Sequence, residues 1–507
     1  MGNLIPKLLL LCCTLLPTLS EIHAEPTERE GTETLLLGGD YPDPSIIRDG
    51  DTYYMVHSSF EYTPGLLIFE SKNLIDWTPV TNALHQYIGS IWAPDIVKHK
   101  NRWYIYFPAV TAESITNMVV WADTPQGPWS EPIDLKIGGI DPGHAVDQNG
   151  NRFLMMNNGM LAPLAADGLS VTGPAQKVYD GWIYPEEWNV EGFCLEGPKI
   201  KKIGKYYYML SAEGGTAGPP TSHMVVVARS ENLFGPWENS PYNPLIHTYG
   251  NDERWCSKGH GTLVDTPEGE WYVVYHAYEH GYYTLGRQTL IEPVEMNAEG
   301  WFIPSSNGKI VKKQNGQQRN LSDDFSSNRI GTQWRFYKTY SSSDFHYEPQ
   351  ALVLRARGSS PADATSLLFQ TGDHAYEMEI EAMCSDKASA GLILFYNPEL
   401  YAGVGLHQDQ IVFHLLGRSQ TFDIPATSRH LWFRLKNDCH IISAWYSFDG
   451  KLWSKIPIAC ETSGYHHNMA EGFLSLQPGI YAAGEGTVTF RNFRYKKNRL
   501  ITYITKP

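Results

Sequence analysis

One pattern recurs five times in the first three hundred residues and constrains this chain more than any other feature. A polar residue is followed, after a turn, by a strand that begins with two large apolar side chains. The strands are marked by Tyr53-Tyr54, Trp103-Tyr104, Phe153-Leu154, Tyr206-Tyr207 and Trp271-Tyr272. Successive markers lie about 50 to 65 residues apart, a period in the range of β-propeller blades. We therefore predict a five-bladed β-propeller over residues 35–310.

Each repeat has a second half, in which another strand ends in Ser or Ala and a loop closes on tryptophan. The clearest examples are Ser71–Trp77, Ala122–Trp129 and Ala228–Trp237. The third repeat, from Phe153 to about Tyr179, keeps this half only weakly. Two hairpins in each repeat supply the four strands of one blade.

One polar candidate precedes each marker strand, and the five candidates are Asp43, Asp95, Asp141, Glu196 and His260. The first strand of every propeller blade lines the central channel, so the repeat is expected to gather four carboxylates and a histidine in one pocket. An Asp-Pro turn is often only structural, but the convergence of several acids on one channel favours catalysis. Asp95, in the sequence APD, is interpreted as a structural residue that hydrogen-bonds its own loop.

Three of these acids lie in turns that proline stiffens. Asp43 stands in YPDPS, Asp141 in GIDPG and Glu196 in LEGPK. Cleavage of a glycosidic bond uses two carboxyl groups, one to protonate the departing oxygen and one to act on water or on the sugar carbon. A third negative charge nearby would raise the pKa of the acid and keep it protonated near neutral pH.

Composition limits the class of partner. The chain has 507 residues and a formal net charge of −15, which argues against nucleic acid and anionic membranes as partners. Its 15 tryptophans and 30 tyrosines suit the faces of sugar rings, although aromatic residues also fill β cores. Neutral polysaccharides therefore remain compatible with the composition.

The N-terminus predicts export. Lys7 precedes an apolar run from Leu8 to Leu16, and Ala24 offers a cleavage point, so residues 1–24 are expected to be a signal peptide of a secreted or periplasmic protein. The run is too short to span a bilayer, and no membrane insertion is expected.

Five cysteines would remain after cleavage, namely Cys194, Cys256, Cys384, Cys439 and Cys460. They show no CxxC spacing, which argues against a zinc site. Their odd number and wide separation favour buried free thiols, and one disulfide stays open as an alternative.

The C-terminal part predicts a second all-β domain. A polar stretch from Ser305 to Asn320 has the composition of a connector. Beyond it, Tyr376–Ala382 alternates apolar residues with glutamates, as in a strand with one wet face, and Asp449-Gly450 marks a hairpin. We expect residues 320–507 to form a β-sandwich.

The same segments carry a family resemblance. GDYPDPSIIRDGDTYYMV, IDPGHAVDQNGNRFL, LEGPKIKKIGKYYYMLSAEGGT, GHGTLVDTPEGEWYVVYH and LGRQTLIEPV together resemble glycoside hydrolase family 43, and they cover the predicted propeller in order. The tail that begins LSDDF at Leu321 resembles the concanavalin-like sandwich often appended in this family.

The resemblance implies an inverting mechanism. Asp43 would be the general base that activates water, and Glu196 the general acid that protonates the leaving oxygen. Asp141 would tune the pKa of Glu196 and orient it. In inverting enzymes the acid and the base stand about 6.5–9.5 Å apart, which leaves room for the water.

The resemblance also implies a sugar-binding pocket. Arg287 matches a sugar-binding arginine, and Trp92, Phe60 and Thr216 would line the pocket of the terminal sugar. His260 matches a histidine that approaches a bound calcium in some members and the substrate in others. No cofactor is required for the reaction, but calcium in the propeller channel is an expectation that the resemblance raises, with His260 as its ligand.

One segment departs from the commoner family pattern. An insert, Asp180–Cys194, precedes Glu196 and should form a loop near the mouth of the pocket. Its Trp182, Tyr184 and Trp188 would either shape a leaving-group subsite or cover the edge of the blade. This insert weakens any transfer of substrate choice from other members.

Three functions compete. The leading hypothesis is an exo-acting glycosidase that removes terminal pentoses from plant polysaccharides or oligosaccharides, with α-L-arabinofuranosides favoured over β-D-xylosides. A retaining fructan hydrolase is disfavoured because Asp43 lies between two prolines and not in an Asn-Asp-Pro-Asn type motif. A non-catalytic carbohydrate-binding protein would be expected to lack at least one of the three acids. The sandwich is expected to pack on the propeller and complete the pocket wall.

Overall fold

The computed structural model describes residues 32–305, 319–425 and 428–498. The predicted signal peptide and most of the predicted connector therefore lie outside the described residues. Nearly all regular structure in the described ranges is β. Three short 3₁₀ helices are the only helices there, η1 (Asn157–Gly159), η2 (Tyr283–Leu285) and η3 (Ser342–Asp344). None of these helices could cross a membrane.

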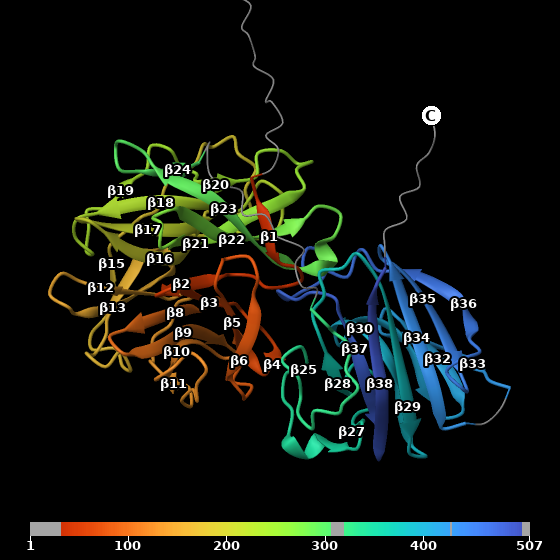
Figure 1. Cartoon of the computed structure of the whole chain (residues 1–507). Coiled ribbons are helices and arrows are strands. Elements are labelled where there is room, and N and C mark those ends of the chain that lie inside the picture. The colour runs from red at the N-terminus through yellow and green to blue at the C-terminus, as the bar shows by residue number, and fades with distance from the viewer. Residues whose placement is uncertain (1–31, 306–318, 426–427, 499–507) are drawn as a thin grey trace, which may run out of the picture. The chain divides into compact units, whose positions relative to one another are not determined.

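Five antiparallel sheets form the blades of a propeller (Figure 1). The first blade contains β2 (Ser45–Asp49), β3 (Thr52–Val56), β5 (Gly65–Ser71) and β6 (Thr78–Leu84). The second contains β7 (Ser90–Ile91), β8 (Asp95–His99), β9 (Arg102–Val110), β10 (Ile115–Ala122) and β11 (Ile133–Asp134). The third contains β12 (Gly143–Val146), β13 (Arg152–Met156), β14 (Met160–Pro163) and β15 (Gln176–Lys177).

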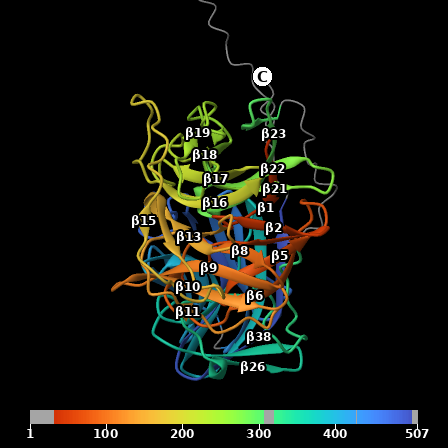
Figure 2. The ribbon, with the colours of Figure 1, turned by 90° about the vertical axis from the view of Figure 1, so that its left-hand side faces the viewer.

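The last two blades follow the same plan. The fourth contains β16 (Glu196–Ile203), β17 (Tyr206–Glu213), β18 (Met224–Ser230), β19 (Glu238–Asn239) and β20 (Ile246–His247). The fifth contains β1 (Thr34–Leu37), β21 (Trp255–Asp265), β22 (Trp271–Glu279), β23 (Arg287–Met296) and β24 (Phe302–Pro304). In Figure 2 the strands of the fourth blade step outward from β16 to β19, and those of the second from β8 to β11.

The first long strand of each blade faces the middle of the propeller. These inner strands are β2, β8, β12, β16 and β21, and each contacts the inner strands of its two neighbours. The loops that lead into the inner strands consequently meet in one place, as the repeat predicted.

Apolar side chains on both faces of each blade explain why the blades stay together. Each of five hydrophobic clusters joins residues of two adjacent blades. Between the fifth and first blades, for example, Val274 and Ile291 pack with Met55 and Phe69. Both faces are buried, which accounts for strands such as β3 in which every residue is buried and for the near-continuous apolar runs in the sequence.

The ring is closed by a strand that the sequence pattern did not predict. β1 pairs antiparallel with β23, with Leu35 opposite Leu290 and Leu37 opposite Thr289. The most N-terminal strand therefore completes the most C-terminal blade, which joins the two ends of the propeller by backbone hydrogen bonds.

The C-terminal domain is a sandwich of two antiparallel sheets around a large apolar core. One sheet contains β25 (Arg335–Tyr337), β28 (Thr365–Leu368), β30 (Ala388–Asn397), β31 (Leu400–His407), β32 (Gln410–Leu415), β33 (Arg418–Asp423) and β37 (Gln477–Gly484), together with β4 (Tyr62–Thr63). The other contains β26 (Phe345–Glu348), β27 (Ala351–Arg355), β29 (Ala375–Cys384), β34 (His430–Asp438), β35 (Ile441–Ser447), β36 (Ser454–Glu461) and β38 (Thr487–Lys497).

Two local predictions for this domain are confirmed. In β29 the apolar residues from Tyr376 to Ala382 are buried while the intervening glutamates are partly exposed. β35 and β36 pair as a hairpin around Asp449-Gly450.

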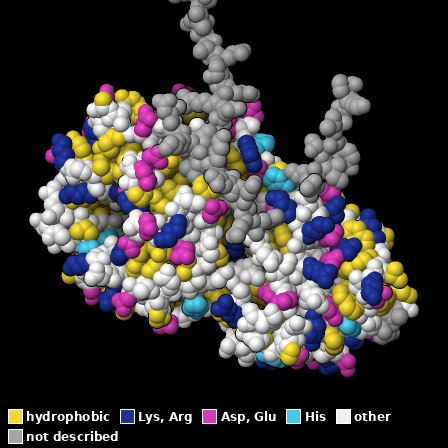
Figure 3. Space-filling view, in the orientation of Figure 1, with side chains coloured by type: hydrophobic (Ala, Val, Ile, Leu, Met, Phe, Trp, Pro, Cys, Tyr) yellow, Lys and Arg dark blue, Asp and Glu magenta, His cyan; other side chains and the backbone are white. Residues whose placement is uncertain are grey.

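Acidic and basic side chains are intermixed on the face of the molecule shown in Figure 3.

Segments of the propeller and the sandwich interlock in two places. β4 lies in the first-blade sequence but pairs with β25, with Thr63 opposite Phe336. Elsewhere, a methyl group added at Gly372 would lie 2.5 Å from the Cα of Gly38. The backbones of the sandwich and of the N-terminal turn therefore touch directly.

The cysteine prediction holds only in part. All five cysteines in the described residues are free thiols, and Cys256, Cys384 and Cys460 are buried. Cys194 is exposed, at the end of the insert, and Cys439 is partly exposed, so the expectation that all would be buried is wrong for these two.

Candidate active site

One pocket of about 350 Å³ brings together eight of the side chains that the sequence analysis named as candidates. They are Asp43, Phe60, Trp92, Asp141, Glu196, Thr216, His260 and Arg287. Ala93, Ile140 and Phe473 complete the lining. The pocket thus draws on every blade of the propeller and on one residue of the sandwich.

The three acids of the pocket occupy matching places in their blades. Asp43 and Asp141 lie two residues before β2 and β12, and Glu196 is the first residue of β16. Asp43 has φ 55° and Asp141 has φ 57°, in the left-handed region that non-glycine residues seldom adopt. Backbone strain of this kind concentrates at functional sites, and here it turns both carboxyl groups toward the pocket.

Asp43 is surrounded by groups that favour its ionised form. Arg287 Nη1 donates to Oδ1 at 3.1 Å and Ser58 Oγ donates to Oδ2 at 2.5 Å. Burial alone would raise the pKa of Asp43, but the positive charge of Arg287 is the largest of the effects that lower it, and the pKa lies well below its usual range. Asp43 is therefore a buried carboxylate at neutral pH.

The surroundings of Asp141 and Glu196 favour the protonated form of each carboxyl group, in contrast to those of Asp43. Burial and the negative charges of Asp141 and Asp43 raise the pKa of Glu196 well above its usual value. Burial and the charge of Asp43 raise the pKa of Asp141 to about 7. Asp141 Oδ2 also accepts a hydrogen bond at 3.1 Å from the amide of Gly197, the residue after Glu196. Asp141 is thus placed both to hold Glu196 in position and to keep it protonated.

Asp95 differs from its prediction. Its carboxylate does not line the pocket and does not bond its own loop. It accepts from Ser45 Oγ at 2.9 Å and from the amide of His144 at 2.8 Å, and it pairs with Lys199 Nζ at 3.3 Å. These partners belong to three other blades, so Asp95 ties inner strands together. The predicted set of four carboxylates in the pocket is reduced to three.

Aromatic rings form one wall of the pocket. Phe60 and Phe473 are stacked with centroids 6.1 Å apart, and Trp92 meets Phe473 edge-on at 5.5 Å. The guanidinium of Arg287 lies 5.4 Å from the centroids of both phenylalanine rings. Phe473 comes from the loop before β37 of the sandwich, so that domain supplies part of the wall, in agreement with its expected role.

His260 is one of three buried histidines beside the acids. Its Nδ1 lies 3.4 Å from Asp43 Oδ1, and burial lowers its pKa to about 3. Glu196, His223 and His260 each place a candidate ligand atom within 4.8 Å of the others. Calcium binds six to eight oxygens, whereas two of these three atoms are imidazole nitrogens and the third belongs to the proposed acid. The side chains therefore do not fit calcium, and we derive no catalytic step through it.

The insert before Glu196 is anchored beside the pocket without lining it. The amide of Trp182 donates to Glu213 Oε1 at 2.7 Å, and Trp188 stacks on His247 at 4.6 Å. Glu191 Oε2 accepts from the amide of Ala217 at 2.8 Å, next to Thr216 in the pocket wall. The insert thus supports the loop that carries Thr216.

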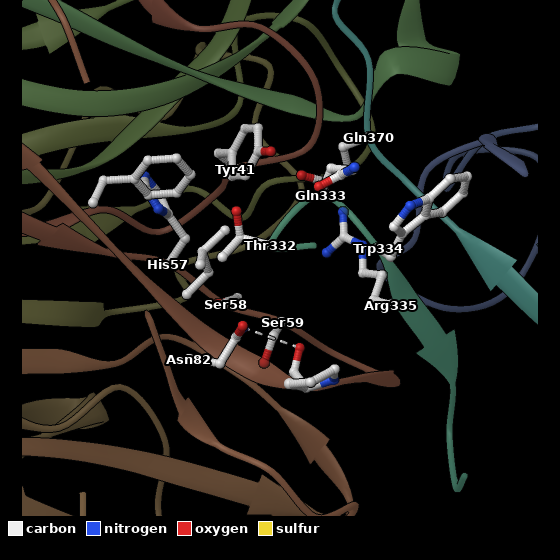
Figure 4. A pocket seen from close by; sticks show the side chains of 13 residues that line it. Tyr41, His57, Ser58, Ser59, Asn82, Thr332, Gln333, Trp334, Arg335 and Gln370 are labelled. Carbon is white, nitrogen blue, oxygen red and sulfur yellow. Dashed lines mark hydrogen bonds between the residues drawn. The ribbon is translucent and has the colours of Figure 1, made fainter. Parts of the chain in front are cut away.

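A second hollow lies beside the loop that carries Ser58 and Ser59 (Figure 4). Its lining includes Tyr41, Thr332, Trp334 and Arg335. None of the described residues that line it is an acid, so it offers no pair of carboxyl groups. The pocket that holds Asp43, Asp141 and Glu196 is the one with the carboxyl groups that hydrolysis uses.

Comparison with known proteins agrees with this chemistry. Residues 34–302 match the family described as Glycosyl hydrolases family 43, and residues 322–496 match the Beta xylosidase C-terminal Concanavalin A-like domain. A non-reducing end alpha-L-arabinofuranosidase of Bacteroides ovatus is 29% identical over 67% of this chain and 66% of its own length. A beta-xylosidase of Bacillus subtilis is 26% identical over 91% of this chain and 99% of its own length.

Solved structures extend the likeness to the whole fold. A family 43 protein from Bacillus licheniformis superposes with a TM-score of 0.81 at 27% identity and covers 92% of this chain and 100% of its own. The xylan beta-1,4-xylosidase from Bacillus halodurans gives 0.80 at 25% identity and covers 91% of this chain and 99% of its own. With a matching propeller, a matching C-terminal domain and three convergent carboxyl groups, the chain belongs to glycosyl hydrolases family 43.

Proposed function

We propose that this protein is an inverting exo-glycosidase that removes terminal pentoses, most readily α-L-arabinofuranosides, from plant cell-wall polysaccharides or oligosaccharides. The observation that carries the proposal is the contrast between Asp43, whose pKa lies below its usual range, and Glu196, whose pKa lies above it. One ionised and one protonated carboxyl group are the two groups that hydrolysis with inversion needs.

The reaction follows from these protonation states. Asp43 accepts a proton from a water molecule as the water oxygen bonds to the anomeric carbon. Glu196 gives its proton to the glycosidic oxygen as the bond from that oxygen to the anomeric carbon breaks. Asp141 keeps Glu196 protonated and in place, and Arg287 holds Asp43 ionised. The proton that Asp43 takes from water replaces the proton that Glu196 gives up, so the hydrolysis is balanced with these two groups and water.

The aromatic wall supports an exo-acting enzyme. Phe60, Trp92 and Phe473 pack against one another at one side of the pocket, where they oppose continuation of a polysaccharide chain. A small hollow of this kind suits one terminal sugar, with the rest of the substrate as the leaving group.

A β-D-xylosidase is the second candidate. Relatives of this chain carry both names, and one from Butyrivibrio fibrisolvens, 29% identical over 89% of this chain, is named for both activities. The ring atoms of the two pentoses can be superposed, so one pocket can accept either. The insert Asp180–Cys194 is the segment we expect to decide between leaving groups.

The test is the hydrolysis of 4-nitrophenyl α-L-arabinofuranoside and β-D-xyloside by the wild type and by Glu196→Ala, together with NMR detection of the anomer first released. We expect activity on at least one glycoside, release with inversion, and a loss of roughly 10² to 10⁴ in the variant on substrates with poor leaving groups. Retention of configuration, or undiminished activity of Glu196→Ala, would contradict the mechanism. A folded wild type that hydrolyses neither glycoside would favour a different glycoside as substrate or a binding protein.

We also propose that the protein is secreted or periplasmic, on the basis of the predicted signal peptide at residues 1–24. Cell fractionation with N-terminal sequencing of the mature protein tests this. A cytoplasmic protein that still begins at Met1 would overturn it.

A further inference from the structure

His276 is a buried histidine that no step of the proposed reaction uses. It lies in β22, is fully shielded from solvent and stacks on His223 with ring centroids 5.2 Å apart. Each of its ring nitrogens nevertheless has a partner in the active site. A buried imidazole with two defined partners has a fixed direction for each hydrogen bond.

The first partner is the backbone of the general base. The amide of Asp43 donates to His276 Nδ1 at 3.0 Å. An amide can only donate, so Nδ1 must present its lone pair. Asp43 Oδ1 also lies 3.1 Å from Nδ1, but a proton on Nδ1 aimed at that oxygen would meet the amide proton and leave the amide without an acceptor.

The second partner is a wall of the sugar pocket. His276 Nε2 lies 3.3 Å from Thr216 Oγ1. Burial lowers the pKa of His276 to about 4, so the ring is neutral at neutral pH and carries a single proton. Since Nδ1 has none, Nε2 holds it and donates to Thr216. The hydroxyl proton of Thr216 must then point elsewhere, and Thr216 lines the pocket.

We propose that His276 is a positioning residue that joins the two halves of the active site: it accepts the amide of Asp43, and through its Nε2 proton it makes the Thr216 hydroxyl a hydrogen-bond donor to a hydroxyl of the bound sugar. The proposal rests on the proposed glycosidase function and adds a determinant of sugar recognition. It selects substrates that present a hydroxyl acceptor to Thr216. It also explains how Asp43 is held at its strained backbone angle.

Two substitutions separate the two halves of this role. His276→Asn can keep an acceptor oxygen near the position of Nδ1 and loses the donor. His276→Gln can keep a donor nitrogen near the position of Nε2 and loses the acceptor. We expect His276→Asn to raise KM about tenfold with kcat nearly unchanged, and His276→Gln to lower kcat about tenfold with KM nearly unchanged.

A double-mutant cycle tests the link to Thr216. Thr216→Val removes the hydroxyl at nearly constant volume. If His276 acts through that hydroxyl, His276→Asn should add little to the KM of Thr216→Val. His414 offers a matched control, because it is also buried with both ring nitrogens hydrogen-bonded and a pKa of about 4 but lies in the sandwich. His414→Gln should leave KM and kcat unchanged.

A purely structural role for His276 predicts a different outcome. Both variants would then lower kcat and raise KM together, in step with their loss of thermal stability, and their effects would add to that of Thr216→Val. That result would overturn the proposal.

A second measurement does not depend on the substrate. Nitrogen NMR of ¹⁵N-histidine-labelled protein, with the His276 signal assigned from its absence in His276→Gln, should show the tautomer protonated at Nε2. A proton on Nδ1 would overturn the positioning role even if the enzyme is active. The expected tautomer in a protein that hydrolyses neither glycoside would instead locate the failure in the proposed function.

Discussion

At the scale of single residues, the pocket assigns different protonation states to chemically similar groups by surrounding them differently. Asp43 faces a guanidinium and a hydroxyl donor, whereas Glu196 faces two other acids. Asp141 stands between these cases, because a lysine and an amide oppose the burial that raises its pKa. The arrangement leaves Asp141 as the group whose charge most directly sets the proton affinity of Glu196.

Substitution of Asp141 should therefore move the pH profile. In Asp141→Asn the negative charge that raises the pKa of Glu196 is gone, so Glu196 loses its proton at lower pH. We expect the alkaline limb of kcat/KM to shift down by about one pH unit. The measurement is a pH–rate profile on both nitrophenyl glycosides.

The control for this shift is Asp51→Asn, because the Asp51 side chain is 88% exposed and pairs with Lys72, and neither residue lines the pocket. Its profile should match that of the wild type. An alkaline limb that stays in place in Asp141→Asn would show that Asp141 does not tune the acid.

Metal removal tests our inference that the cluster of Glu196, His223 and His260 does not bind calcium. Because His223 and His260 offer nitrogen and Glu196 is the proposed acid, we expect dialysis against EDTA to leave kcat and the melting temperature unchanged. Activity that falls on chelation and returns with Ca²⁺ would contradict this expectation. Return with Zn²⁺ but not Ca²⁺ would point to a transition metal held by the imidazoles.

At the scale of elements, the loop before β37 brings a sandwich residue into a propeller pocket. Phe473 packs on Phe60 and Trp92, and His467 also stacks on it, with ring centroids 4.4 Å apart. Removing its ring opens the wall that we propose confines the terminal sugar.

We expect Phe473→Ala to raise KM roughly tenfold, equivalent to about 1.4 kcal/mol, with a smaller effect on kcat. Steady-state kinetics on the preferred glycoside measure this. Phe448→Ala is the matched control, since Phe448 is also a sandwich phenylalanine but is 37% exposed in a hairpin. Equal KM values for Phe473→Ala and the wild type would show that this sandwich residue does not contribute to sugar binding.

The elements also show where sequence reasoning succeeds and where it stops. The inner strands and their acids could be predicted because a repeat places equivalent residues at equivalent points of each blade. Asp95 follows the same repeat but pairs with Lys199, and a contact between distant blades leaves no local signal. Phe473 and β1 were missed for the same reason, because each acquires its role only from a partner far away in the chain.

The histidines illustrate a different limit. His276 is the last residue of a segment, GHGTLVDTPEGEWYVVYH, that the family resemblance already included, yet its role depends on the directions of two hydrogen bonds. Residue type and spacing carry no information about those directions. Only the positions of the Asp43 amide and of Thr216 reveal them.

At the scale of the whole molecule, the sandwich touches the turn that leads to Asp43, the proposed general base. Gly372 lies against Gly38, and the side chain of Gln370 donates to the carbonyl of Asp40. The same Asp40 accepts the amide of Arg287 at 3.0 Å. A change in the sandwich can therefore displace both Arg287 and Asp43.

Gly372→Ala tests this connection. Its new methyl group would meet the backbone of Gly38 at 2.5 Å, so the two segments must separate, at a cost of about 1–3 kcal/mol in the free energy of unfolding. We expect a lower melting temperature and a fall in kcat/KM of about tenfold or more, because small displacements of catalytic groups are expensive in rate.

Gly464→Ala is the control, because nothing lies within 4 Å of the added methyl group. It should resemble the wild type in both measurements. A Gly372→Ala enzyme with normal kcat/KM and a reduced melting temperature would show that this contact stabilises the fold but does not position the catalytic groups.

The pairing of β1 with β23 has a consequence for biosynthesis. The ribosome makes β1 before any other strand of the propeller, but its partner appears only after four blades have been made. Until then, β1 lacks its partner strand and the propeller is incomplete, so apolar surface and an unpaired strand edge are exposed. Such exposure favours aggregation. Such a protein gains from a chaperone, or from passage through a membrane channel in an unfolded state, that delays folding until the last blade is complete.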